Sequence, residues 1–507
     1  MSSKATTQNQ DKPIKSMIPA RMDKMPWSRF HWMVILGLGT AWILDGLEVQ
    51  FVSLAGYKDS LGMDEAWVGI AGTVYLLGQV SGALFFGRLS DTLGRKKLFV
   101  LTLAIYLIGS GAAAFAPSAP QGHDGGLHPG IVVFLICRFV AGAGIGGEYS
   151  AINAAVDELI PGKYRGRVDL AINGTYWGGA FLAGAASFFL LNHDLIDTNL
   201  GWRIGFFIGP VLGIAIIFMR RHIPESPRWA LTHGHPEQAE GIVQEIEEQV
   251  TAQGKQLPKL DDSKAEWIKG REGLNAKQLA YVFFKMYPTR TVLGVTLMIT
   301  QSFLYNAFFF TYEGVLGHFY GKPEHVVAIF FLPFAAGNLL GPLLLGHFFD
   351  TIGRRKMIGG CYGIAAVVLL LSAFLFRAEL LTATSHVALW CVSFFFASAG
   401  ASAGYLTVSE IFPLECRGQA ISYFFSIAQC VGATGPAIFG ALITASKEAN
   451  SRTPMFWGYI AAAVITLIGS LVAFKWGVDA EGKALEEIAP PLSSYDEHGN
   501  ESTRLPV

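Results

Sequence analysis

The 507 residues are 51% hydrophobic and only 15% charged, whereas soluble domains usually carry about 25% charged residues. The formal net charge is −1, and the sequence contains no long basic run of the kind that binds nucleic acid. This composition argues against a soluble globular protein and favours a chain embedded in a lipid bilayer.

Apolar segments long enough to cross a bilayer recur along the whole chain. A membrane-spanning helix needs about 20 mostly apolar residues. The sequence predicts twelve such helices, at residues 31–56, 67–86, 98–117, 130–151, 168–192, 202–220, 290–314, 325–347, 357–376, 385–408, 419–444 and 454–475. We therefore expect an all-α membrane protein.

Positive charges in the loops predict its orientation, because cytoplasmic loops hold the excess of Lys and Arg. They gather after the second, fourth and eighth helices, around Arg95, Arg165 and Arg354, whereas residues 118–129 carry none. We expect a multi-pass protein of the plasma (inner) membrane with both termini in the cytoplasm.

A long polar insert divides the predicted helices into two sets of six. Within it, Ala239, Ile242, Val243 and Ile246 recur at helical spacing and predict a short amphipathic helix. The expected organisation is a cytoplasmic N-tail (1–30), an N-terminal half (31–220), the cytoplasmic insert (221–289), a C-terminal half (290–475) and a cytoplasmic C-tail (476–507).

Two short sequences occur once in each half. Residues 87–97 read GRLSDTLGRKK and residues 346–356 read GHFFDTIGRRK. Residues 158–166 read ELIPGKYRG and residues 410–418 read EIFPLECRG. The repeats indicate two related halves, an arrangement that places a substrate site at their interface near the bilayer midplane.

The loop at 87–97 and its repeat resemble the signature of the major facilitator superfamily. Residues 223–230, IPESPRWA, resemble the PESPRWL sequence of its sugar porter branch. Residues 479–488, DAEGKALEEI, resemble a degraded form of that branch's PETKGxxLEEI tail. The resemblance implies the major facilitator fold and a secondary transporter, not an enzyme, that works by alternating access.

Charged residues repeat at the predicted cytoplasmic helix ends of both halves. One interpretation is that they only set topology and form surface ion pairs, each worth about 0–1 kcal/mol. Their repetition favours an inner gate, in which ion pairs hold the helix ends together. The gate residues are Asp91, Arg95, Glu158, Arg165, Asp350, Arg354, Glu410 and Arg417.

Ionisable residues also occur inside the predicted spans, where they are costly and usually functional. Asp45 and Glu48 share a face of the first helix, and Arg138 lies at matching depth in the fourth. We interpret Asp45 as a proton switch with Arg138 as its partner, as the resemblance to proton-coupled sugar porters implies. The alternatives are a permanent ion pair and, for Glu48, a wet position near the outer interface. Gly142 and Gly146 follow Arg138 in steps of four and predict close helix packing.

Uncharged polar residues within the spans form the candidate substrate site. Any one of them could instead bond a neighbouring helix, but as a group they match a site for a polar solute. They are Gln301, Tyr305, Asn306, Asn338, Asn173 and Tyr405.

The sugar porter resemblance applies to these positions unequally. Gln301 and Asn306 keep its QxxxxN spacing, and Asn338 occupies the place of its sugar-binding Asn. Asn173 and Tyr405 stand where that branch usually carries Gln and Trp. The first helix reads DGLE, which is similar to the DG(Y/F)D of aromatic-acid and other metabolite–proton symporters.

The leading prediction is a proton-coupled symporter of a sugar or sugar-like polyol. The alternatives are a proton symporter of an organic or aromatic acid on the same fold, and a nutrient sensor that binds without transporting. The sequence has no Walker lysine motif, no CxxC pair and no metal-ligand spacing, so we expect no cofactor and no metal. The expected partners are a small-molecule substrate, protons and the bilayer, with a monomer as the functional unit.

Overall fold

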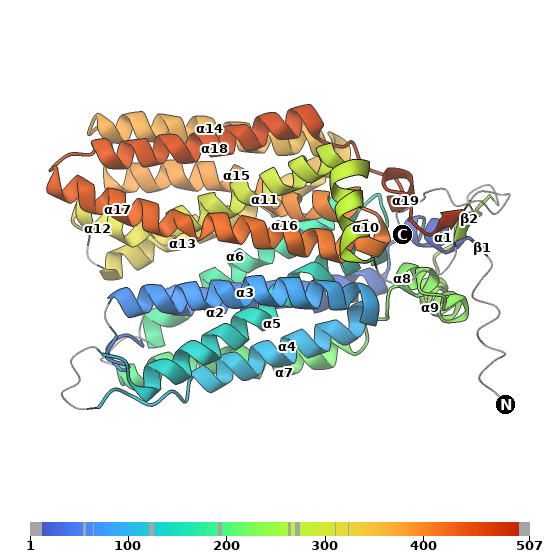
Figure 1. Ribbon diagram of the computed structural model, residues 1–507, viewed down its shortest axis with the longest axis horizontal. Helices are drawn as coiled ribbons and strands as arrows, with labels where there is room; N and C mark the ends of the chain where they lie inside the picture. Colours follow the sequence, from blue (N-terminus) through green and yellow to red (C-terminus); the bar gives the residue numbers. More distant parts are fainter. Residues whose placement is uncertain are drawn as a thin grey trace.

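A computed structural model describes residues 13–53, 57–63, 65–120, 126–190, 195–261, 265–268, 274–309, 311–322 and 324–495. Its apolar segments form helices that run side by side along the longest axis (Figure 1). In the described chain, eleven helical stretches are long and apolar enough to cross a membrane. These correspond to α2 (Arg29–Ser53), α3 (Glu65–Leu93), α4 (Arg95–Ala113), α5 (Pro129–Leu159), α7 (Thr198–Arg220), α11 (Pro288–Phe309), α13 (Glu324–Thr351), α14 (Arg354–Arg377), α15 (Ala383–Ile411), α16 (Arg417–Gly432) with α17 (Thr434–Glu448), and α18 (Thr453–Trp476).

The remaining predicted span is α6 (Arg165–Leu190), which packs lengthwise between α2 and α13. Its polar residues, among them Arg165, Arg167, Asp169 and Asn173, leave it outside the eleven apolar stretches. The eleven stretches are those of a multi-pass membrane protein, and α6 is consistent with the twelfth expected span.

Two of the expected spans are each divided into two helices. After α11, the chain continues as α12 (Tyr312–Tyr320). A short 3-10 turn η3 (Leu414–Cys416) precedes α16, and α17 follows α16 after a break at Ala433. Pro436 explains that break, because a proline has no backbone N–H to donate to the carbonyl four residues earlier.

The helices form two groups. Helices α2 to α7 pack mainly on one another, as do α11 to α18, and the groups meet where α6 packs on α13 and α15 and where α16 packs on α3 and α5. Close packing of α3 on α5 depends on Gly142 and Gly146, since a Cβ on either would lie within 2.3 Å of a carbonyl oxygen of α3. This contact brings Arg138, one turn before Gly142, against α3.

The repeated loop has the same cap in both groups. Gly94 and Gly353 precede α4 and α14 with φ of 93° and 113°, a region that favours glycine. The Glu225 carboxylate accepts hydrogen bonds from the first two backbone amides of α4, at 2.8 and 3.2 Å. The Glu481 carboxylate accepts from the first amide of α14 at 3.3 Å. The two sugar-porter-like segments therefore supply the acids that cap these helix N-termini.

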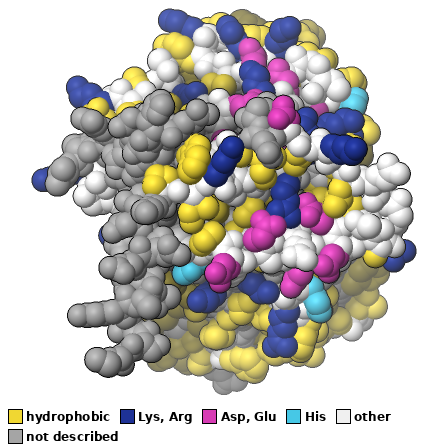
Figure 2. Space-filling model, turned by 90° about the vertical axis from the view of Figure 1, so that its right-hand side faces the viewer, with side chains coloured by type: hydrophobic (Ala, Val, Ile, Leu, Met, Phe, Trp, Pro, Cys, Tyr) yellow, Lys and Arg dark blue, Asp and Glu magenta, His cyan; other side chains and the backbone are white. Residues whose placement is uncertain are grey.

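Short elements cover one end of the bundle, which we call the polar end (Figure 1). Charged side chains of both signs intermingle on its surface (Figure 2). Its α9 buries Ala239, Val243 and Ile246, three of the residues whose spacing predicts a helix there. The helical elements are α1 (Ile18–Asp23), α8 (Pro227–Thr232), α9 (Pro236–Ala252), α10 (Ala276–Tyr281), the π-helical turn η2 (Val282–Met286) and α19 (Leu485–Ile488).

The polar end also contains a small sheet that the all-α expectation omits. Strands β1 (Ile14–Ser16), β2 (Glu266–Ile268) and β3 (Ser494–Tyr495) pair antiparallel in the order β1-β2-β3. Ile268 lies opposite Ile14 on one side and Ser494 on the other. The sheet therefore joins the N-tail, the insert and the C-tail.

Candidate functional site

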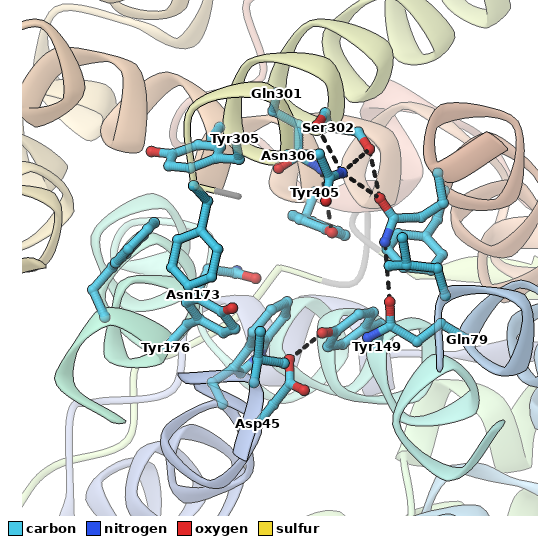
Figure 3. A pocket seen from close by; sticks show the side chains of 18 of the residues that line it. Asp45, Gln79, Tyr149, Asn173, Tyr176, Gln301, Ser302, Tyr305, Asn306 and Tyr405 are labelled. Carbon is cyan, nitrogen blue, oxygen red and sulfur yellow. Dashed lines mark hydrogen bonds between the residues drawn. The ribbon is translucent and has the colours of Figure 1, made fainter. Parts of the chain in front are cut away.

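A central cavity lies between the two helix groups, with about 1070 Å³ of empty space that is partly open to solvent. Both groups contribute to its wall, and aromatic side chains dominate it (Figure 3). The aromatic residues are Trp42, Tyr75, Tyr149, Tyr176, Trp177, Tyr305, Phe309, Tyr405 and Phe425. The amides are Gln79, Asn173, Gln301, Asn306 and Gln429, and the charged residues are Asp45 and Arg138.

The aromatic rings form two patches, one stacked and one tilted. Trp42 stacks on Tyr149 with ring centroids 4.5 Å apart and an interplanar angle of 10°. From the other helix group, Tyr305 approaches Trp177 with centroids 5.3 Å apart. Rings held in this way offer apolar faces on which a flat solute can stack.

Asp45 is buried at the edge of the cavity and is held by two tyrosines. The Tyr75 hydroxyl donates to one of its oxygens at 2.9 Å, and the Tyr149 hydroxyl donates to the other. The expected ion pair between Asp45 and Arg138 is wrong, because Arg138 donates to Glu48 instead. Glu48 lies nearly one turn beyond Asp45 on α2, and the depth argument from sequence did not resolve one turn.

Glu48 is buried, so it is not the solvent-exposed residue near the outer interface that one interpretation made of it. Glu48 and Arg138 are 3% and 1% exposed. The Arg138 guanidinium also lies 4.0 Å from the centroid of the Tyr75 ring, a cation–π contact. Tyr75 therefore contacts both the ion pair and Asp45.

The amides of the cavity donate hydrogen bonds to other groups of the protein. Gln301 donates to the Tyr405 hydroxyl at 3.3 Å, and Asn306 donates to the Ser302 carbonyl at 2.8 Å. Gln429 donates to Gln79 at 3.0 Å, a bond that joins the two helix groups across the cavity. Gln79 and Gln429 were not anticipated, although both are polar residues inside predicted spans.

Two of the expected substrate residues differ in their access to the cavity. Asn338 is 0% exposed and does not line it; its side-chain oxygen accepts from Tyr305 at 2.8 Å, so Asn338 orients that tyrosine. Asn173 lines the cavity, and its amide donates to Asn153 and to Asp169, each at 3.1 Å. Tyr305, Asn306, Gln301 and Tyr405 all face the cavity.

The predicted gate residues come together beneath the cavity, at the polar end. Within each helix group, an arginine at the start of a helix pairs with a glutamate: Arg95 with Glu158 at 3.0 Å, and Arg354 with Glu410 at 3.1 Å. Asp350 adds an ion pair with Arg354 at 2.9 Å. The side chain of Asp91 lies outside the described part of the structure.

Further ion pairs join the two groups. Arg165 approaches Glu410 at 3.6 Å, and Arg417 approaches Glu158 at 3.5 Å. Asp350 pairs with Arg167 at 3.1 Å and also accepts from the Arg167 backbone amide at 3.0 Å. These contacts join the two helix groups at the polar end.

The N-tail and C-tail extend this network with residues that the sequence analysis did not single out. Asp23 of α1 pairs with Arg165 and with Arg228, each at 2.9 Å, and Glu486 of α19 approaches Arg228 at 3.4 Å. Asp23 and Glu486 raise the pKa of the buried Arg228 against the opposing effect of its burial. The PESPRWL-like and LEEI-like sequences around Arg228 and Glu486 were the available signal.

Comparisons with known proteins agree with this architecture. The structure has the fold of the major facilitator superfamily proton:xylose symporter XylE, with a TM-score of 0.72 at 19% sequence identity over 91% of this chain and 98% of XylE. A model of the family "Sugar (and other) transporter" matches residues 46–491, so the chain belongs to that transporter family.

Two curated relatives show the range of solutes in this family. The niacin transporter NiaP of Acinetobacter baylyi is 24% identical over 92% of this chain and 99% of its own length. The major myo-inositol transporter IolT of Bacillus subtilis is 24% identical over 88% of this chain and 89% of its own length.

Proposed function

We propose that this protein is a proton-coupled symporter of a small aromatic carboxylate, working by alternating access with the polar end in the cytoplasm. The observation that carries the proposal is the aromatic wall of the cavity, with Arg138 at its edge. A flat ring would stack between the patches at Trp42 and Trp177. The similarity to the niacin transporter NiaP, which extends along nearly its whole length, supports a solute of this kind.

The ion pair at the cavity edge suggests how proton and anion would be coupled. Arg138 now donates to Glu48, and a buried charge without a partner is strongly unfavourable. If Glu48 or Asp45 takes a proton, Arg138 can turn to the substrate carboxylate without a net charge entering the site. Proton and anion would then bind together, as symport requires.

A second candidate is the sugar or polyol symporter of the leading prediction. Gln301 and Asn306 face the cavity at the QxxxxN spacing, and XylE and IolT carry xylose and myo-inositol by their names. The position of Asn338 behind Tyr305 removes one expected sugar contact from the cavity wall. The loss of this sugar contact and the aromatic wall of the cavity both favour the aromatic carboxylate over a sugar.

Uptake by the purified protein in proteoliposomes would test the choice. We expect radiolabelled nicotinate to accumulate when the outside is more acidic, and unlabelled benzoate to compete. Xylose and myo-inositol should not compete. Accumulation of either of these two, with no effect of nicotinate on it, would establish the second candidate instead.

A further inference from the structure

Two carboxylates lie between the central cavity and the gate without a matching set of cations. Asp157 on α5 and Asp169 on α6 are both 0% exposed. Neither belongs to the gate residues predicted from the repeats. Burying an ionised carboxylate is strongly unfavourable unless it is paired and hydrogen-bonded.

The arginines of the gate are already engaged by other acids. The nearest one, Arg165, is 4.0 Å from Asp157, but it also forms ion pairs with Asp23 at 2.9 Å and Glu410 at 3.6 Å. No described residue forms a well-aligned hydrogen bond to either Asp157 oxygen, although the Ser409 hydroxyl lies close enough to favour the ionised form. Asp157 therefore shares its nearest cation with two other acids.

The Asp169 carboxylate has still less positive charge close to it. Among the described residues it forms no ion pair; one oxygen accepts from the Asn173 amide at 3.1 Å and the other has no hydrogen-bond partner. The charges that act on Asp169 are Asp157 and Glu410, which disfavour its ionised form, and Arg354 and Arg165, which favour it. Those acting on Asp157 include Glu410, Arg165 and Arg417.

Among the described residues, most of the buried atoms around Asp169 that lack a hydrogen-bond partner are acceptors. They are the side-chain oxygen of Asn173, one oxygen of Asp169 and both oxygens of Asp157, whereas Arg165 Nε, 4.0 Å from Asp157, is a donor without a partner. A proton on one of these carboxylates would supply a hydrogen-bond donor to this set and remove a buried charge. Asn173 also lines the cavity, so a hydrogen bond connects the cavity wall directly to Asp169.

We propose that Asp169, with Asp157 beside it, is a second proton-binding site, separate from Asp45, which holds a proton while the polar end is closed. Opening of the gate would admit water and free Arg165 and Arg354, so the carboxyl would release its proton on that side. The proposal rests on the alternating access proposed above, and it adds one proton to each transport cycle.

Infrared spectroscopy of the purified full chain would test the site without any transport assay. In wild-type protein near neutral pH, Asp169 should contribute a carbonyl absorption of a protonated carboxylic acid. Asp169→Asn should remove that band, and Asp169→Glu should shift it without removing it. Glu415→Gln is the matched control, because Glu415 is a buried carboxylate that accepts hydrogen bonds from Leu492 and Ser493 and has no contact with the gate arginines among the described ion pairs; it should leave the band unchanged. An identical band in wild type, Asp169→Asn and Asp169→Glu would overturn the proposal.

Thermal unfolding of Asp169→Asn, compared with Asp350→Asn, gives an independent measurement. Asp169→Asn mimics the protonated acid, so its Tm should equal or exceed that of the wild type. Asp350→Asn breaks charge-assisted bonds and should lower it. A decrease in Asp169→Asn as large as in Asp350→Asn would show an ionised, stabilising Asp169 and refute the site. Neither measurement depends on the solute, so a failed nicotinate assay leaves this test intact.

Discussion

Arg138 pairs with Glu48, while Tyr75 lies between this ion pair and Asp45. The Tyr75 ring contacts the guanidinium and its hydroxyl donates to Asp45 at 2.9 Å. Asp45 therefore has no direct bond to a cation in this conformation among the described residues.

The ion pair itself can be tested by stability. Glu48→Leu should destabilise the protein by about 3–5 kcal/mol, because it leaves Arg138 buried without its partner. The double variant Glu48→Leu/Arg138→Met should recover most of that loss, since two apolar side chains replace two charges. Thermal unfolding in detergent measures both. If the double variant is no more stable than Glu48→Leu, the pair does not have the energetic role assigned to it.

Asp45→Asn should separate proton coupling from solute movement. The amide mimics the protonated acid and can still accept from Tyr75 or Tyr149. We expect nicotinate counterflow to persist while accumulation driven by a pH gradient is lost. Uphill uptake at the wild-type rate would remove Asp45 from the coupling mechanism. Asp59→Asn, a change at a residue outside the cavity, is a control that should preserve both activities.

The aromatic wall should contribute more to binding than the amides do. Trp177→Ala removes a stacking surface and should raise the Kd for nicotinate by roughly tenfold or more, given stacking energies of about 1–3 kcal/mol. Gln301→Ala and Asn306→Ala each remove hydrogen bonds and should raise it up to about tenfold. Asn338→Ala should act through Tyr305, so Tyr305→Phe and Asn338→Ala together should cost little more than either alone. Additive losses in that pair would place Asn338 in direct contact with the solute.

If these ion pairs form an inner gate, Asp350→Asn should impair transport while the protein still inserts into the membrane. Asp350 links the two groups through Arg167 and accepts from its backbone amide, and the amide variant loses both charge-assisted contacts. Asp91→Asn is the equivalent change in the first repeat and should have the same effect. Uptake rates and surface labelling measure the two properties separately. Normal uptake by both variants would reduce the cluster to a topological role.

The small sheet should loosen as the pH rises. Burial and the neighbouring Glu486 raise the pKa of Glu266 on β2 from 4.5 to about 8, against the opposing effect of Arg228. A raised pKa means that the stabilising contribution is fully present below about pH 4.5 and is lost as the pH rises through about 8.

Limited proteolysis of the N-tail can measure that loosening. Cleavage should be faster at pH 9 than at pH 6 after correction for protease activity, and Glu266→Gln should abolish the difference. Glu245→Gln, at an exposed position on α9, is the matched control and should behave like the wild type. An unchanged pH response in Glu266→Gln would contradict the assignment.

The sequence by itself determined the helices, the repeat and the composition of the gate. Long apolar segments must become helices in a bilayer because their backbone polar groups have no other partners there. The duplicated loops placed Arg95, Glu158, Arg354 and Glu410 at equivalent helix ends, and the structure pairs them accordingly.

Only the tertiary structure decided which buried groups meet. Periodicity places Asp45 and Glu48 on one face, but a difference of one turn between α2 and α5 selects Glu48 as the partner of Arg138. The same holds for Asn338, which helix rotation places behind Tyr305, and for Asp169, whose lack of a cation depends on how its neighbours share Arg165. Hydrogen bonds and ion pairs form over about 3–4 Å, whereas sequence spacing locates a side chain only to within a helical turn of about 5.4 Å.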